Sequence, residues 1–249
     1  IKLTKIHDYP DEFSLYSSIS KYYNVPIENI TIGFGATDIL QRIIQTSVEH
    51  LYIVEPAFEM VSVYCSIHRV PYTNRSAQQF SDLSKDSQVY IANPNGNNGK
   101  AYDLSQYSFK LFIIDEAYSE FYKKYEKPYD ENTIIIKTLS KSLGLAGLRV
   151  GFSFASISYT NILQAVRMNY ITNSFASLIV PKVIEEIPKV VTRMNAAKVL
   201  LQNLYDCKPS KGNYVLFKQQ NKLTDKFGSK LTSEKLYRMA LADTSTLDV

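Results

Sequence analysis

The sequence predicts an α/β fold built on a mostly parallel sheet, and two observations support this class. Short apolar runs, each ending in polar, Pro or Asn residues, occur at 50–56, 87–94, 110–117 and 132–140. Continuous apolar runs of this length are typical of strands buried on both faces. Residues 37–51 carry apolar side chains at helical spacing, so helical and strand patterns alternate along the chain.

The composition indicates a globular protein with a substantial core. The chain has 249 residues, of which 45% are hydrophobic and 21% charged, which suits one large domain or a large and a small one. The net charge of +4 comes without a dense basic stripe, so we expect no nucleic-acid partner. The two cysteines and three histidines form no metal-ligand pattern, which predicts no metal site. The two cysteines lie far apart in the chain, so we expect no disulfide framework and a reducing, cytoplasmic location. No apolar run is long enough to span a membrane, so we expect no membrane partner.

We expect two domains. Residues 21–180 contain the strand and helix alternation and are predicted to form the large α/β domain. Residues 176–206 predict a helix with a break at Pro188. Residues 181–249, together with 1–20, are expected to form a smaller and apparently truncated α+β domain.

A lysine follows the last apolar run in a turn of small residues, "TLSKSLGLAGLR". At the end of a buried strand Lys141 would face a crevice, where desolvation and a nearby cation favour its neutral, nucleophilic amine. Arg149, with Ser140 and Thr138, offers a fork-shaped cation and hydroxyls, a set typical of phosphate binding. The alternatives are a solvated surface lysine and a loop arginine in a salt bridge.

An acidic residue ends the run "FIIDEAY". The carboxylate of Asp115 needs a partner there, such as a protonated ring nitrogen, a magnesium ion or an arginine, and Tyr118 could donate to a ligand oxygen. The alternative is a helix N-cap. Glycines precede a helix expected to begin near Ala36, whose free N–H groups could hold a phosphate. Phe58, just past a strand, could stack on a planar ligand or simply pack in the core.

Together these motifs resemble the pyridoxal-phosphate enzymes of the aminotransferase superfamily, fold type I, and in particular the histidinol-phosphate aminotransferases and threonine-phosphate decarboxylases. "SKSLGLAGLR" at 140–149 matches a family pattern of Ser-Lys-x-x-Gly-Leu-Ala-Gly-x-Arg, and Asp-Glu-Ala-Tyr precedes it at 115–118. "DYPDEF" is similar to the family's Tyr-Pro-Asp start, and "PSKGNYVLFK" to its Pro-Ser-x-x-Asn-aromatic strand.

The resemblance implies a seven-stranded-type sheet sandwiched by helices, with pyridoxal 5'-phosphate as cofactor. It implies a transaminase, a homodimer with shared active sites, that moves an amino group between an amino acid or amino-phosphate and a keto acid in amino-acid metabolism. Lys141 would form the Schiff base and shuttle a proton, Asp115 would pair with the ring nitrogen, and Tyr118 would bind the ring hydroxyl.

The resemblance also implies the binding residues. Arg238 would grip the substrate carboxylate, aided by Asn213, and Tyr9 would reach the phosphate of the neighbouring subunit. The implied cofactor-binding residues are Ala36, Thr37, Phe58, Asn95, Asp115, Tyr118, Thr138, Ser140, Lys141, Arg149 and Tyr9.

The chain departs from the family at 93–99, "NPNGNNG", where the family has Asn-Pro-Asn-Asn-Pro-Thr-Gly. Gly96 replaces the asparagine that contacts the ring hydroxyl, and Asn95 or Asn97 would have to substitute for it. Competing functions are a pyridoxal-phosphate decarboxylase or lyase, a non-catalytic relative, and a nucleotide hydrolase. The last lacks the phosphate loop that its chemistry requires.

Overall fold

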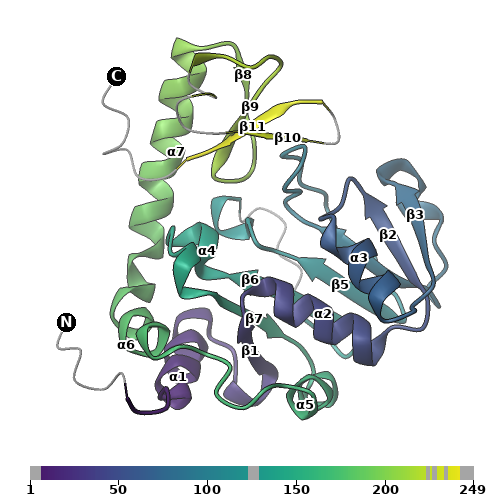
Figure 1. The fold of residues 1–249 in the computed structure, drawn as a ribbon. Helices are drawn as coiled ribbons and strands as arrows, with labels where there is room; N and C mark the ends of the chain where they lie inside the picture. The colour runs from purple at the N-terminus through teal and green to yellow at the C-terminus, as the bar shows by residue number, and fades with distance from the viewer. Residues whose placement is uncertain (1–6, 123–128, 223–224, 226–228, 233–234, 242–249) are drawn as a thin grey trace.

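The computed structural model describes most of the chain, and Figure 1 shows its fold. The described residues are 7–122, 129–222, 225, 229–232 and 235–241. Within them, no helix combines the length and apolar character that crossing a membrane requires. The Tyr-Pro-Asp motif at residues 9–11 lies within the described part, just before the first helix.

A seven-stranded sheet forms the centre of the molecule, in the order β1-β7-β6-β5-β4-β2-β3. Strands β3, β2, β4, β5 and β6 run parallel, while β7 is antiparallel to both β6 and β1. The predicted mostly parallel sheet is therefore confirmed. The strands are β1 Ile30–Phe34, β2 Leu51–Glu55, β3 Tyr72–Ser76, β4 Gln88–Ala92, β5 Leu111–Asp115, β6 Thr133–Thr138 and β7 Val150–Phe154.

Helices cover both faces of this sheet (Figure 1). On one face lie α2 (Ala36–Ser47), α3 (Met60–Ile67) and α5 (Ile157–Ala165), packed on the apolar side chains of the central strands. On the other, α1 (Glu12–Tyr23) and α6 (Ser174–Val183) cover β1 and β7. The 3-10 turn η2 (Ala77–Asp82) and the chain around Phe109 cover β2 and β4 there. Apolar burial on both faces explains the continuous apolar runs of the sequence.

A second, four-stranded sheet has the order β10-β11-β9-β8 and is antiparallel throughout. The long helix α7 (Ile187–Leu204) runs from beside α6 to this sheet and packs on it (Figure 1). A cluster that includes Tyr118, Met194 and Tyr214 joins the two sheets. Helix α1 packs on the large sheet, and the predicted domain limits stay a prediction. The small-sheet strands are β8 Cys207–Lys208, β9 Tyr214–Phe217, β10 Lys230–Leu231 and β11 Tyr237–Ala240.

The helix predicted over 176–206 is interrupted earlier than expected. Helix α6 ends at Val183, the 3-10 turn η5 covers Ile184–Glu186, and α7 then begins at Ile187. Pro188 lies in the first turn of α7. A proline is tolerated there because the N–H it lacks would have no partner within the helix. The break therefore precedes the proline.

The strand directions bring many chain segments to one edge of the large sheet. The parallel strands β2, β4, β5 and β6 end there, and β1 runs in the same direction because it and β6 are both antiparallel to β7. Strand β7 begins at this edge, so Arg149, the residue before it, joins the residues that follow the other strands. In open α/β sheets, ligands bind beyond this edge.

Candidate active site

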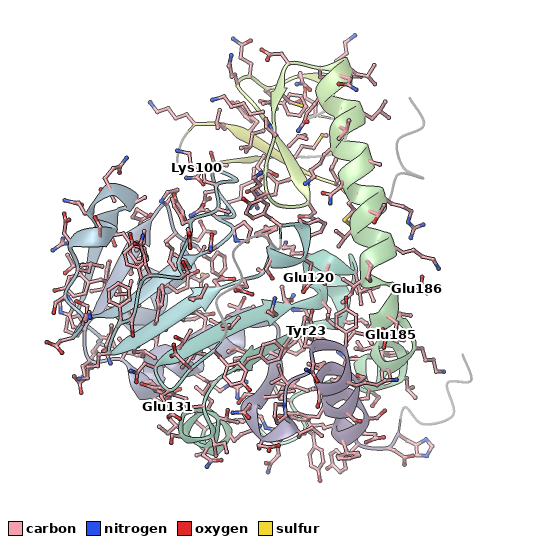
Figure 2. The ribbon with its side chains drawn as sticks, turned by 180° about the vertical axis from the view of Figure 1, so that it is seen from behind. Tyr23, Lys100, Glu120, Glu131, Glu185 and Glu186 are labelled. Atoms are coloured by element: carbon pink, nitrogen blue, oxygen red, sulfur yellow. The ribbon has the colours of Figure 1, made fainter. Side chains whose placement is uncertain are left out.

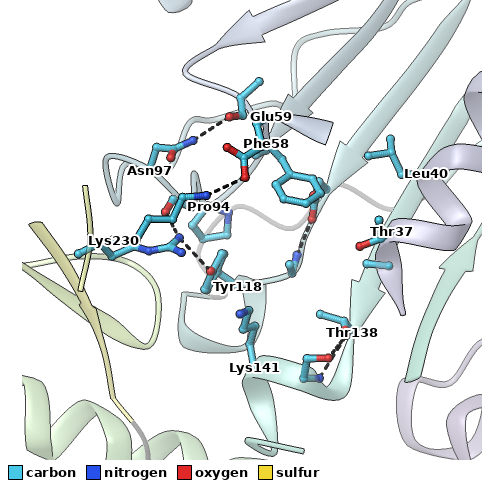
Figure 3. Close-up of a pocket in the computed structure, with 18 of the residues that line it drawn as sticks. Thr37, Leu40, Phe58, Glu59, Pro94, Asn97, Tyr118, Thr138, Lys141 and Lys230 are labelled. Carbon is cyan, nitrogen blue, oxygen red and sulfur yellow. Dashed lines mark hydrogen bonds and ion pairs between the residues drawn. The ribbon is translucent and has the colours of Figure 1, made fainter. Parts of the chain in front are cut away.

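A cavity of about 690 Å³ lies between this edge and strands β10 and β11 of the small sheet. Figure 3 shows its walls. Most of the residues that the sequence singled out line it: Ala36, Thr37, Phe58, Asp115, Tyr118, Thr138, Ser140, Lys141, Arg149 and Arg238.

Lys141 lies in the short helix α4 (Leu139–Ser142), which Thr138 caps by accepting a hydrogen bond from the Ser140 N–H. Its side chain points toward Tyr118, with Nζ 5.8 Å from the ring centroid (Figure 3). Burial lowers the pKa of the lysine, and the cations Arg238 and Arg149 lower it further. The amine is therefore more readily available as a nucleophile than that of a surface lysine.

Asp115 ends β5 on the cavity wall. One carboxylate oxygen, Oδ1, accepts the Ala117 N–H at 3.0 Å, and Oδ2 accepts the Tyr90 hydroxyl at 3.0 Å. Burial raises the pKa of Asp115, while these two hydrogen bonds and the nearby Lys141 work in the opposite direction. Such a carboxylate is suited to bind a protonated ring nitrogen.

The part of the cavity beside the N-terminus of α2 is suited to bind an anion. Helix α2 presents the backbone N–H groups of its first turn, at Ala36 and Thr37, to the cavity. Gly35, with φ +81°, has no Cβ, and the guanidinium of Arg149 occupies the space that a Cβ there would fill. Arg149 itself has a left-handed φ of 52°, at the turn into β7. Ser140 adds a hydroxyl to this end of the cavity.

Thr138 has less to offer a ligand. Its hydroxyl donates to the carbonyl of Val150 at 2.8 Å, so its hydrogen is used within the protein. This bond ties the end of β6 to the start of β7. Gly151 allows the close approach of β7 to α2, because a Cβ there would collide with the backbone of Gly35 and Ala36.

The divergent loop at 93–99 places its asparagines in different roles. Asn95 is buried and does not line the cavity: its amide donates to the Pro56 carbonyl at 2.5 Å, and its Oδ1 accepts the Asn97 N–H at 2.9 Å. Asn97 does line the cavity, with its amide donating to Ala57 at 2.8 Å. Of the two predicted substitutes, Asn97 is the one within reach of a ligand.

Gly96 packs against the site. A Cβ there would lie 2.9 Å from Tyr118 Cε2, so the missing side chain leaves space for this ring. The Gly96 carbonyl accepts a hydrogen bond of 2.6 Å from Arg238 Nη1, which also donates to the Tyr118 hydroxyl at 3.4 Å. Burial raises the pKa of Tyr118, and Arg238 opposes this shift. Arg238 is thus held beside Tyr118 with its fork at the cavity.

Besides Asn95, two further predicted residues lie outside the cavity. Tyr9 is 75% exposed and stacks on Tyr170, with ring centroids 4.1 Å apart. Asn213 is buried, and its amide donates to the Leu241 carbonyl at 3.4 Å. In contrast, Glu59 and Lys230 line the cavity and form an ion pair, with Lys230 Nζ 2.8 Å from Glu59 Oε1. This pair connects β10 of the small sheet to the start of α3, which packs on the large sheet. No motif marked these two, because their meeting depends on how the small sheet sits over the large one.

A buried charge cluster lies behind the segment that carries Asp115 and Tyr118. Lys137, on β6 and only 6% exposed, pairs with Glu116 at 2.8 Å and lies 3.6 Å from Glu120. It also donates to the Ser119 hydroxyl at 2.5 Å. Burial, followed by Glu120, raises the pKa of Tyr23, which Figure 2 labels with Glu120. The cluster ties β6, which leads to Lys141, to the turn after β5.

The site therefore combines an amine of lowered pKa, a half-buried carboxylate and a cation at a helix N-terminus within one cavity. The carboxylate matches a ring nitrogen, the amine an aldehyde, and the cation with its N–H and hydroxyl donors a phosphate. These residues fit pyridoxal phosphate. Phe58, which also lines the cavity, offers an aromatic face for the ring of the cofactor.

The family Aminotransferase class I and II matches the chain over residues 4–244. The chain belongs to this family and is a pyridoxal-phosphate-dependent aminotransferase.

Individual relatives refine the comparison. The chain is 28% identical to the histidinol-phosphate aminotransferase of Caldanaerobacter subterraneus subsp. tengcongensis, over 89% of this chain and 72% of the relative. It is 25% identical to that of Pyrococcus furiosus, over 88% and 72%.

Solved structures share the fold. The histidinol-phosphate aminotransferase of Sinorhizobium meliloti in complex with pyridoxal-5'-phosphate superposes with a TM-score of 0.83 at 17% identity, covering 99% of this chain and 82% of that one. The L-threonine-O-3-phosphate decarboxylase of Porphyromonas gingivalis gives a TM-score of 0.75 at 16% identity, covering 98% and 89%.

Proposed function

We propose that the chain transfers an amino group from an amino acid or amino-phosphate to a keto acid, and that its substrate resembles histidinol phosphate. The observation that carries the proposal is the position of the Lys141 amine in one cavity with Asp115, Arg149 and Arg238. Histidinol-phosphate aminotransferases among the curated relatives support the substrate class. The family's chemistry requires one amine, one ring-nitrogen partner and two anion sites, and these four residues provide them.

Each residue has a distinct task in this proposal. Bound pyridoxal phosphate supplies the electron sink that stabilises charge at the substrate α-carbon. The Lys141 Nζ attaches the cofactor and later moves the proton at that carbon. Asp115 holds the ring nitrogen, and Tyr118 orients the ring through its hydroxyl. Arg238 binds the substrate carboxylate through its fork-shaped donors.

The phosphate of the cofactor would be held by the first turn of α2 at Ala36 and Thr37, by Ser140 and by Arg149. We further propose a cytoplasmic homodimer in which Tyr9 reaches the partner's phosphate. The exposure of Tyr9 supports this part of the proposal, because an aromatic side chain on the surface is available to a second copy.

The test begins with the visible spectrum of the purified protein after addition of pyridoxal phosphate, followed by borohydride reduction and peptide mapping. We expect a label on Lys141, which Lys141→Ala abolishes. Incubation with glutamate should convert the cofactor to its amine form, whereas release of carbon dioxide would identify a decarboxylase. Cofactor fixed on another lysine, or no cofactor binding, would overturn the proposal. Gel filtration with light scattering tests the homodimer.

A further inference from the structure

A tyrosine occupies a core position at which its neighbours are apolar. Tyr90 lies in the middle of β4 with 0% of its surface exposed, on the face of the sheet that α2 and α3 cover. The surrounding side chains include Ile53, Ile113 and Ile134. A phenol oxygen in such surroundings carries a free-energy cost unless it finds a hydrogen-bond partner. An aliphatic side chain would avoid this requirement, so the hydroxyl calls for an explanation.

The strand register directs this hydroxyl to Asp115. Tyr90 pairs with Ile113, and Ala92 pairs with Asp115, so Tyr90 and Asp115 are diagonal neighbours across β4 and β5. Diagonal neighbours on one face are within reach of a long aromatic side chain. Ala92, directly opposite the aspartate, has only a methyl group and leaves this path open. The Tyr90 hydroxyl donates to Asp115 Oδ2 at 3.0 Å.

The carboxylate is thereby held at both oxygens. The Ala117 N–H binds Oδ1 at 3.0 Å and the Tyr90 hydroxyl binds Oδ2, which fixes the rotation of the group about its own axis. An ionised carboxylate has about four acceptor positions. These two bonds therefore leave acceptor capacity for a donor in the cavity, which Asp115 also lines.

We propose that Tyr90 is a positioning residue for the cofactor: its hydroxyl fixes the Asp115 carboxylate and keeps the shared proton on the ring nitrogen rather than on the carboxylate. This inference rests on the proposed function. A hydrogen bond to the ionised carboxylate favours that form, so the proton stays with the ring. Without it, burial would shift the proton toward Asp115 and weaken the ring as an electron sink.

Other charged groups face this pair and are held constant in the test. Lys141, from α4, lowers the proton affinity of Asp115 by its charge. Glu55, at the end of β2, acts on Tyr90 from the cavity side, and its own carboxylate accepts the Ala57 N–H at 2.7 Å. Tyr90→Phe removes one oxygen and leaves these groups in place.

The experiment compares Tyr90→Phe with Tyr64→Phe, a matched change in the same core cluster at a residue that does not itself line the cavity. Each protein is titrated with pyridoxal phosphate and with an analogue that has carbon in place of the ring nitrogen. We expect Tyr90→Phe to weaken binding of pyridoxal phosphate about tenfold, as the loss of a hydrogen bond to a charged group predicts. Binding of the carbon analogue and both affinities of Tyr64→Phe should stay at wild-type values.

A second readout follows the proton directly. With ¹⁵N-labelled cofactor, the ring nitrogen signal of Tyr90→Phe should move toward the neutral pyridine position. 3-Fluorotyrosine installed at Tyr90 keeps the hydroxyl, makes it a stronger donor and should move the signal the opposite way. This second variant retains the native shape and keeps the test decisive if Tyr90→Phe folds poorly.

The outcomes separate the two proposals. If cofactor attaches to Lys141 and glutamate reacts, but neither Tyr90 variant changes the ¹⁵N signal or the preference for ring nitrogen, the role of Tyr90 is overturned and the proposed function stands. If wild-type protein attaches no cofactor at Lys141, the proposed function itself fails. An equal loss of affinity for both cofactor forms would show that Tyr90 supports only the fold, which also overturns the inference.

Discussion

Removal of the Lys137 charge should destabilise the protein far more than removal of an exposed lysine. Lys137 is 6% exposed and pairs with Glu116 at 2.8 Å, close to Glu120. Lys137→Met keeps an unbranched chain of similar length but takes the cation away from two buried carboxylates. Loss of one partner of a buried ion pair costs about 3–5 kcal/mol of unfolding free energy. This is a large part of the roughly 5–15 kcal/mol that stabilises a typical protein.

The assay is urea unfolding of the cofactor-free protein, followed by circular dichroism. Lys110→Met is the matched control, because Lys110 also forms a 2.8 Å pair, with Glu49, but its side chain is 51% exposed. Solvent screens an exposed pair, so this control should change the stability little. Lys137→Arg keeps the charge and should retain more stability than Lys137→Met.

A second substitution tests the cause. Adding Glu116→Gln to Lys137→Met removes one of the carboxylates that lost its cation, so the double variant should recover part of the stability. Such coupling between contacting residues is commonly about 0.5–3 kcal/mol. A loss of stability in Lys137→Met no larger than that of the Lys110 control would refute the reasoning, since burial would then not govern the cost.

Three further predictions concern the cavity and the packing of β7 on α2. Attachment of the cofactor to the cofactor-free protein, followed by absorbance, should rise with pH and level off below the ordinary lysine pKa of 10.5, because the pKa of Lys141 is lowered. Arg149→Met removes one of the cations that lower this pKa, so it should move the profile to higher pH. Arg238→Gln should raise KM for the amino acid by about tenfold or more, through loss of a charged hydrogen bond, and steady-state kinetics with an unchanged KM would contradict this. Gly151→Ala should lower the free energy of unfolding, measured in urea, by about 1–3 kcal/mol, because the added Cβ collides with the backbone of Gly35 and Ala36.

The sequence by itself determined the class of sheet and the chemical centre of the site. Continuous apolar runs exist because helices bury both faces of the strands, and the ends of parallel strands meet at one edge. Asp115 ends one such strand and Lys141 lies three residues beyond the end of the next, so their positions in the chain were enough to predict that they line the same edge. The helix N-terminus at Ala36 was also predictable, because glycines precede an apolar pattern at helical spacing.

Only the tertiary structure decided the contacts that depend on register, strand direction and the packing of the two sheets. Tyr90 reaches Asp115 because β4 and β5 pair in one particular register, and a shift by one residue would turn the ring to the opposite face. Glu59 pairs with Lys230 because the small sheet packs over this edge of the large one. Asn97 faces the cavity while Asn95 is buried, because the loop folds on the Pro56–Ala57 backbone. Such long-range contacts leave no local pattern in the sequence.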